Sequence, residues 1–175
     1  MPSLVGSEMC IRDRQQNKNC FSISLKAINM IKKFLQIFKS PAQSMYQIIG
    51  EETGTRELVH NFYSTMESDP KAINCLRVHE LRDEKIPEEV KNKLFMFLSG
   101  WFGGPNLFIE TYGHPRMRAR HMHIKIGAAE SSEWLYCMNI ALNMHSLKIK
   151  KKQKELMHNS FKALTIRIQN SPKEI

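Results

Sequence analysis

The segment that decides the fold runs from Leu94 to His121 and reads LFMFLSGWFGGPNLFIETYGHPRMRARH. Its first part carries four apolar residues at positions i, i+3, i+4 and i+7: Leu94, Phe97, Leu98 and Trp101. This spacing places them on one face of a helix. Two glycines and a proline then end the helix, and a second helix-like segment leads to a histidine flanked by arginines. An apolar wall, a break and a histidine could form a pocket for a flat apolar cofactor with one axial nitrogen ligand.

Helical spacing continues on both sides of this segment. Upstream, three apolar residues share a face and Ser68-Asp69-Pro70 ends their helix: Leu58, Phe62 and Met66. Ile86-Pro87 predicts the start of the helix that runs to Trp101. Downstream, two more stripes follow: Trp134, Cys137, Met138, Ala141 and His145, and then Met157, Phe161, Leu164 and Ile168. No alternating run is long enough to predict a sheet, so the fold class is all-α.

Charge is distributed unevenly along the 175 residues, whose net charge is +9. Residues 1–40 hold seven basic and two acidic side chains, and residues 147–175 hold eight basic and two acidic. Residues 41–146 hold 11 basic and 13 acidic side chains, so the central part is slightly acidic. This distribution argues against nucleic acid as a partner of the central domain.

Cysteine spacing argues against a structural zinc site, because none of the four cysteines forms a CxxC pair. Reduced cysteines are typical of an intracellular protein, and we expect a cytoplasmic one. The alternative is an organelle, if residues 15–40 are a genuine targeting segment. Three lysines interrupt the apolar stripe of residues 21–38, so no membrane span is expected there.

Three parts of the chain are predicted. Residues 1–44 form an extension outside the main domain, and we interpret residues 1–14 as an artefactual leader. Residues 45–170 form one helical domain, which is long enough for one core. Residues 171–175 form a short tail.

Four blocks in order resemble the group II truncated haemoglobins: Phe62-Tyr63, Leu76-Arg77-Val78-His79, residues 95–105 followed by 112–121, and residues 133–138. The resemblance runs from about Met45 to about Asn170. It implies a two-over-two α-helical sandwich, a shortened globin that encloses haem (iron protoporphyrin IX). It also implies reversible binding of dioxygen or another diatomic ligand, such as CO or NO, and hence oxygen binding or transport.

The resemblance implies roles for individual residues. His121 corresponds to the proximal iron ligand. Tyr63, His79 and Trp134 correspond to the polar residues around the sixth coordination site, where His79 could donate a second hydrogen bond or link to Tyr63. Five further positions are expected to hold haem: Val90 and Leu94 facing the iron, Phe97 against the porphyrin, and Arg118 or Arg120 paired with a propionate.

One departure from the family pattern follows His121. Members usually carry a proline in this segment, which reads Met122-His123-Ile124 here. We expect the turn after the proximal helix to be looser as a result. His114 and His123 could suggest a zinc site with His121, but spacings of seven and two do not place the three on one helical face.

Two alternatives to the oxygen carrier stay open. A polar triad could assist O–O bond cleavage, which would make the protein a peroxidase or a nitric-oxide-detoxifying enzyme that needs a reductase as electron donor. The chain could also be a helical interaction module without haem. The physiological ligand and the oligomeric state are not predicted.

Overall fold

The computed structural model describes residues 43–171, and our expectations for residues 1–42 and 172–175 lie outside this range. The described chain is helical and contains no β-strand, only an isolated bridge between Arg82 and Lys85. Its elements are α2 (Met45–Ile48), α3 (Glu51–Ser68), η1 (Pro70–Ala72), α4 (Ile73–Arg77), α5 (Glu88–Trp101), α6 (Leu107–Tyr112), α7 (Met117–Arg120), α8 (Ala128–Met144) and α9 (Lys151–Ile168). The all-α prediction is confirmed.

Helix α3 begins and ends where local chemistry requires. Gly50 precedes it with a left-handed backbone, φ +92°, and two glutamates in the first turn face the positive end of the helix dipole. Asp69 has an extended backbone before Pro70 and ends the helix, as predicted. The three residues of the predicted stripe, Leu58, Phe62 and Met66, are fully buried.

Helix α5 ends at a glycine turn that fixes the next segment. Gly103 adopts φ +86°, and a Cβ built on Gly104 would lie 2.5 Å from the ring of Tyr46. The backbone of Tyr46 also donates a hydrogen bond to the carbonyl of Phe102 at 2.9 Å. The turn at the predicted break after Trp101 therefore packs closely against α2.

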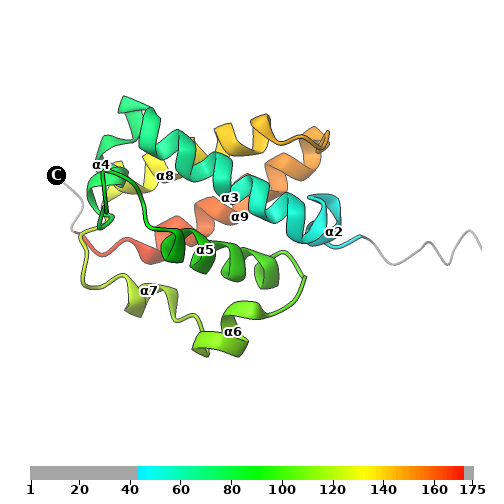
Figure 1. The fold of residues 1–175 in the computed structure, drawn as a ribbon, viewed down its shortest axis with the longest axis horizontal. Coiled ribbons are helices and arrows are strands. Elements are labelled where there is room, and N and C mark those ends of the chain that lie inside the picture. The colour runs from blue at the N-terminus through cyan, green and yellow to red at the C-terminus, as the bar shows by residue number, and fades with distance from the viewer. Residues whose placement is uncertain (1–42, 172–175) are drawn as a thin grey trace, which may run out of the picture. The chain divides into compact units, whose positions relative to one another are not determined.

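The core lies between α3, α8, α5 and α9. Helix α3 packs most extensively against α8 and next against α5, while α8 also packs against α9. Phe161 of α9 is fully buried, and its ring centroid lies 5.4 Å from that of Trp134 and 4.9 Å from that of Trp101. Figure 1 shows α3 above α5, with the short helices α6 and α7 below it.

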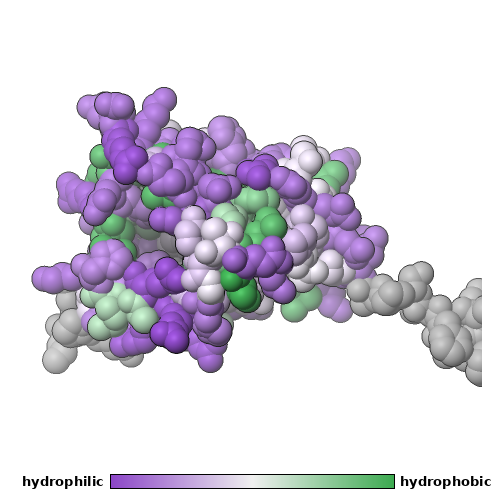
Figure 2. All heavy atoms as spheres, turned by 60° about the horizontal axis from the view of Figure 1, so that its bottom comes forward, coloured by the Kyte–Doolittle hydropathy of each residue, from purple (hydrophilic) through white to green (hydrophobic). Residues whose placement is uncertain are grey.

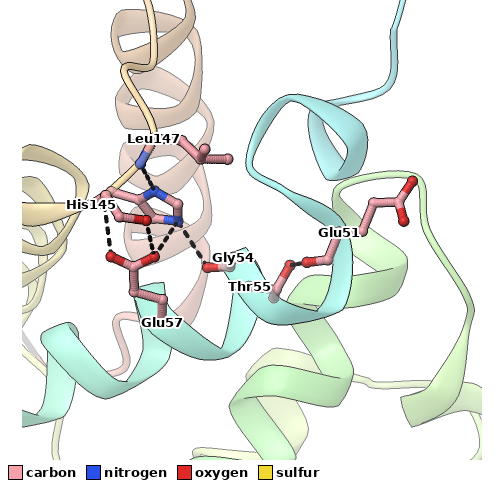
Figure 3. Close-up of polar contacts among 7 residues, drawn as sticks. Glu51, Gly54, Thr55, Glu57, His145 and Leu147 are labelled. Carbon is pink, nitrogen blue, oxygen red and sulfur yellow. Dashed lines mark hydrogen bonds and ion pairs between the residues drawn. The ribbon is translucent and has the colours of Figure 1, made fainter.

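A buried histidine joins α3 to the loop between α8 and α9 (Figure 3). The His145 side chain has no exposed surface, and its Nε2 donates to the carbonyl of Gly54 at 2.9 Å while its Nδ1 accepts from the backbone of Leu147 at 3.2 Å. Glu57 accepts two hydrogen bonds from Ser146, at 2.7 Å from the backbone and 2.6 Å from the hydroxyl. Partial burial raises the pKa of Glu57, but these two bonds and the nearby His145 outweigh it and leave the pKa low.

The surface is mostly hydrophilic. Figure 2 shows one face on which hydrophobic residues form separate patches among polar ones. Within residues 43–171, no helix combines the length and the apolar character needed to cross a membrane.

Candidate functional site

A cavity of about 450 Å³ lies among α3, α5, α7, α8 and α9. Its volume is in the range of small-molecule and cofactor pockets. Three of its lining residues come from one face of α5: Val90, Leu94 and Phe97. Of the apolar wall predicted from the sequence, Leu94, Phe97 and Leu98 line the cavity and Trp101 does not. Phe97 stacks on Trp101 with ring centroids 5.8 Å apart.

His121 lines the cavity immediately after α7. Its Nδ1 lies 2.6 Å from the carbonyl oxygen of Met117. Because a carbonyl can only accept, Nδ1 carries a proton, and in a neutral imidazole this leaves the lone pair on Nε2. A hydrogen bond of this kind sets the tautomer of a metal-binding histidine. His121 therefore has the arrangement that an axial ligand requires.

Asn170 holds the segment that follows His121. Its side-chain amide donates to the carbonyls of His121 at 2.8 Å and Ile124 at 2.9 Å, and its side-chain oxygen accepts from the backbone of Ile126 at 3.0 Å. Its own backbone N–H donates to the carbonyl of Ile126 at 3.0 Å. We expected a looser turn here because a proline is absent, yet these four bonds restrain it from the end of α9.

Three polar side chains from different elements meet the same cavity: Tyr63 of α3, His79 after α4, and Trp134 of α8. The rings of Tyr63 and His79 are perpendicular with centroids 6.0 Å apart. Burial raises the pKa of Tyr63, so it stays a neutral phenol. Within residues 43–171, the Tyr63 hydroxyl and the Trp134 indole N–H have no hydrogen-bond partner.

His79 is held in the same way as His121. Its Nδ1 lies 2.8 Å from the carbonyl oxygen of Cys75, four residues earlier. Burial lowers the pKa of His79, the hydrogen bond to Cys75 opposes this shift, and the nearby His121 adds to it. The net effect is a pKa below the ordinary value, so the imidazole is neutral at neutral pH.

One of the two candidate arginines lines the cavity and the other does not. Arg120 lines the cavity, where its guanidinium donates to the carbonyl of Tyr112 at 3.0 Å and lies 5.3 Å from the ring centroid of Phe108. Arg118 does not line the cavity, and its Nη1 donates to the carbonyl of Gln169 at 2.8 Å. The side chain of Arg118 turns to the end of α9, so Arg120 is the one of these two arginines that lies at the cavity.

The other two histidines of this region also differ in whether they line the cavity. His123 lines the cavity, whereas the Nδ1 of His114 accepts a hydrogen bond from the backbone of Arg116 at 3.2 Å in the preceding turn. Across residues 43–171, no cluster of three or more histidine, cysteine, aspartate or glutamate side chains could hold a metal ion.

Ser131 supplies a test of whether the cavity fits a large cofactor. This side chain of α8 lines the cavity, is 5% exposed, and has a buried hydroxyl without a partner in the described chain. A buried hydroxyl without a hydrogen bond is costly, so it indicates a cavity that an occupant or water fills. An apolar wall, His121 with its Nε2 free and Arg120 at the lining together fit haem.

A family model described as bacterial-like globin matches residues 44–170. The chain belongs to the bacterial-like globin family. The group 2 truncated hemoglobin YjbI of Bacillus subtilis (strain 168) is 34% identical to this globin over 108 residues, which cover 62% of this chain and 73% of that protein.

Solved structures agree with this assignment. A cold-adapted truncated hemoglobin from the Antarctic marine bacterium Pseudoalteromonas haloplanktis is 32% identical, with a TM-score of 0.68, and covers 74% of this chain and 100% of its own. A group II 2-on-2 hemoglobin from Agrobacterium tumefaciens is 30% identical, with a TM-score of 0.69, and covers 77% and 100%. The predicted family, the two-over-two helical sandwich and haem as cofactor are confirmed.

Sequence reasoning did not find several residues of this site: Met117, Ser131, Glu133 and Asn170. Met117 and Asn170 act through the backbone of the segment around His121. Glu133 accepts hydrogen bonds from the Asn74 side chain at 2.6 Å and the Cys75 backbone at 2.8 Å. The contacts of Glu133 and Asn170 join residues far apart in the sequence, and the chain carries no local signal for them.

Proposed function

We propose that this truncated haemoglobin binds dioxygen and other diatomic ligands, CO and NO among them, reversibly at a haem iron that His121 ligates. When bound, haem supplies the iron at which such a ligand attaches. The observation that carries the proposal is the bond of 2.6 Å from His121 Nδ1 to the Met117 carbonyl, in a cavity that Tyr63, His79 and Trp134 also line.

In this proposal, different residues hold His121, the porphyrin face and the propionate. The Met117 carbonyl fixes the imidazole tautomer of His121, and Asn170 holds the backbone that carries it. The apolar wall of α5 packs against the porphyrin face and excludes water. Arg120 meets a haem propionate, since a guanidinium suits a carboxylate.

Tyr63 and Trp134 would tune the affinity. A phenol hydroxyl and an indole N–H can both donate to a ligand that gains partial negative charge. Both donors lack hydrogen-bond partners within residues 43–171, so both can donate to a bound ligand. We expect that removing either donor speeds the release of dioxygen.

Stopped-flow and laser-photolysis measurements on the haem-loaded full chain test the proposal. We expect reversible dioxygen binding, with faster dissociation in Tyr63→Phe and in Trp134→Phe. The matched control is Tyr136→Phe, because the Tyr136 hydroxyl donates to Asp69 at 2.6 Å and does not line the cavity. Equal dissociation rates in all four proteins would contradict the tuning roles, and a haem-loaded protein that binds neither dioxygen nor CO would overturn the function.

A further inference from the structure

The segment from the end of α8 into the first turns of α9, residues 143–156, carries a charge that the haem site does not use. We call this segment the basic turn. It contains one acidic residue, Glu155, and five basic ones: Lys148, Lys150, Lys151, Lys152 and Lys154. None of its residues lines the cavity. Figure 1 shows the connection between α8 and α9 at one end of the helical domain, away from α7.

Most of this positive charge has no partner of opposite sign in the described chain. Lys151 lies 4.0 Å from Glu155, and Lys154 donates to the side chain of Asn143 at 2.9 Å. The second contact also holds the start of α9 beside the end of α8. Within residues 43–171, three exposed lysines of the basic turn form no ion pair: Lys148, Lys150 and Lys152.

The lysines do not stabilise the helix that they begin. Positive side chains in the first turn of a helix meet the positive end of its dipole, which costs stability. Helices α3, α5 and α8 each carry glutamate in the first turn, whereas α9 carries no acidic residue there. A local stabilising role therefore does not explain the lysines, and their charge suits an anionic partner outside the chain.

Exposed aliphatic side chains lie among the lysines. Met144 is 59% exposed, Leu147 is 45% exposed and Leu156 is 51% exposed. Lys152 and Leu156 are four residues apart on α9, so they share one face of the helix. Aliphatic side chains enter the boundary between lipid headgroups and acyl chains, while lysine ammonium groups stay among the headgroups. The basic turn contains no phenylalanine, tyrosine or tryptophan to stack on nucleic-acid bases, so its composition favours lipid over nucleic acid.

We propose that the basic turn docks this globin on an anionic membrane surface, with Leu147 and Leu156 at the headgroup boundary and the lysines beside lipid phosphates. Charge complementarity selects this occupant. Residues 1–40 hold seven basic and two acidic side chains, so they have the same sign as the basic turn and do not complement it. Docking of this kind is reversible and weakens as salt screens the charges. The inference goes beyond the proposed haem site and does not depend on it.

Cosedimentation of the full chain with two kinds of vesicle tests the proposal: phosphatidylcholine alone, and an equal mixture of phosphatidylcholine and phosphatidylglycerol. We expect binding to the anionic vesicles only. A lysine near an anionic surface strengthens binding by about fivefold, so replacing the three unpaired lysines of the basic turn by glutamine should weaken it by about 100-fold.

The matched control replaces three exposed lysines outside the basic turn by glutamine, and we expect it to bind like the wild type: Lys71, Lys85 and Lys125. Both triple variants lose the same charge and keep residues 1–42, so a difference between them reports the basic turn. Equal binding of the two triple variants, or no binding of the wild type to the anionic vesicles at low salt, would overturn the proposal.

Leu156→Ser tests the apolar contribution, and its control is Leu81→Ser, at a leucine that is 42% exposed outside the basic turn. About half of the Leu156 side chain is left to bury, so we expect its variant to bind roughly fivefold more weakly and the control to bind like the wild type. Three results would overturn the assignment to lipid: wild-type binding by Leu156→Ser, tighter binding of the wild type to duplex DNA than to vesicles, or a lipid-free dimer that the basic-turn triple variant dissociates.

Discussion

Replacing Asn170 by alanine removes three side-chain hydrogen bonds to the backbone around His121, at 2.8, 2.9 and 3.0 Å. At a net value of roughly 0.5–1.5 kcal/mol each, their loss costs about 3 kcal/mol of unfolding free energy. For a chain of this size, that corresponds to a fall in Tm of roughly 6 to 12 °C. Thermal unfolding of the haem-loaded protein, followed by circular dichroism, measures it.

The position of the proximal ligand gives a readout that a loss of stability alone would not move. We expect the iron–histidine stretching band of the ferrous protein, measured by resonance Raman, to broaden in Asn170→Ala, because His121 loses the bond to its carbonyl. Asn170→Asp keeps the acceptor for Ile126 but turns an oxygen toward two carbonyls, so we expect an equal or larger effect.

Gln169→Ala is the matched control, since this neighbouring residue has no side-chain hydrogen bond within residues 43–171. We expect its Tm and its iron–histidine band to match the wild type. If Asn170→Ala behaves like this control in both measurements, the account of how the segment after His121 is held is refuted.

Three other changes have defined outcomes. Hydrogen bonds lower the pKa of Glu57 in the folded state, so the stability that they give is present above the unfolded pKa of this carboxyl and is lost as pH falls through its folded pKa. We expect Glu57→Gln to weaken this acid dependence when urea unfolding is measured from pH 7 down to pH 3. A pH profile identical to that of the wild type would contradict this. Gly104→Ala brings a methyl group to 2.5 Å from the ring of Tyr46, so we expect a loss of about 1–3 kcal/mol in urea unfolding, and a variant as stable as the wild type would show that the turn adapts freely. Burial raises the pKa of Cys137 to about 12 and also raises that of Cys75. After iodoacetamide treatment at pH 8, peptide mapping should therefore find both thiols unmodified in the folded protein and modified in urea. Rapid labelling of the folded protein would mean that the thiols are accessible.

The helices could be predicted from the sequence because their signals are local. The spacing of Leu58, Phe62 and Met66 predicts one buried face, and all three are buried. The prolines and glycines that bound α3 and α5 restrict the backbone at the positions where these helices begin and end. Burial within a stripe is less predictable: Trp101 shares a face with Leu98, yet it is 37% exposed where Leu98 is fully buried.

The candidate site could be predicted in its residue types but not in its hydrogen bonds. The predicted cavity residues come together, apart from Arg118, whose long side chain reaches the carbonyl of Gln169 instead. The side-chain hydrogen bonds of Asn170 join residues 44 to 49 positions apart, so no local pattern indicates them. The hydrogen bond of His79 Nδ1 depends on the direction of the Cys75 carbonyl, which the fold decides.

The central claim of this account is that His121 ligates the iron of a haem in this cavity. The most direct test is the resonance Raman spectrum of the ferrous, ligand-free full chain, beside that of His121→Ala with and without added imidazole. We predict an iron–histidine stretching band in the wild type, no such band in the variant, and its return when imidazole fills the space left by the side chain. A band that persists in His121→Ala without imidazole, or that is missing from the haem-loaded wild type, would contradict the claim.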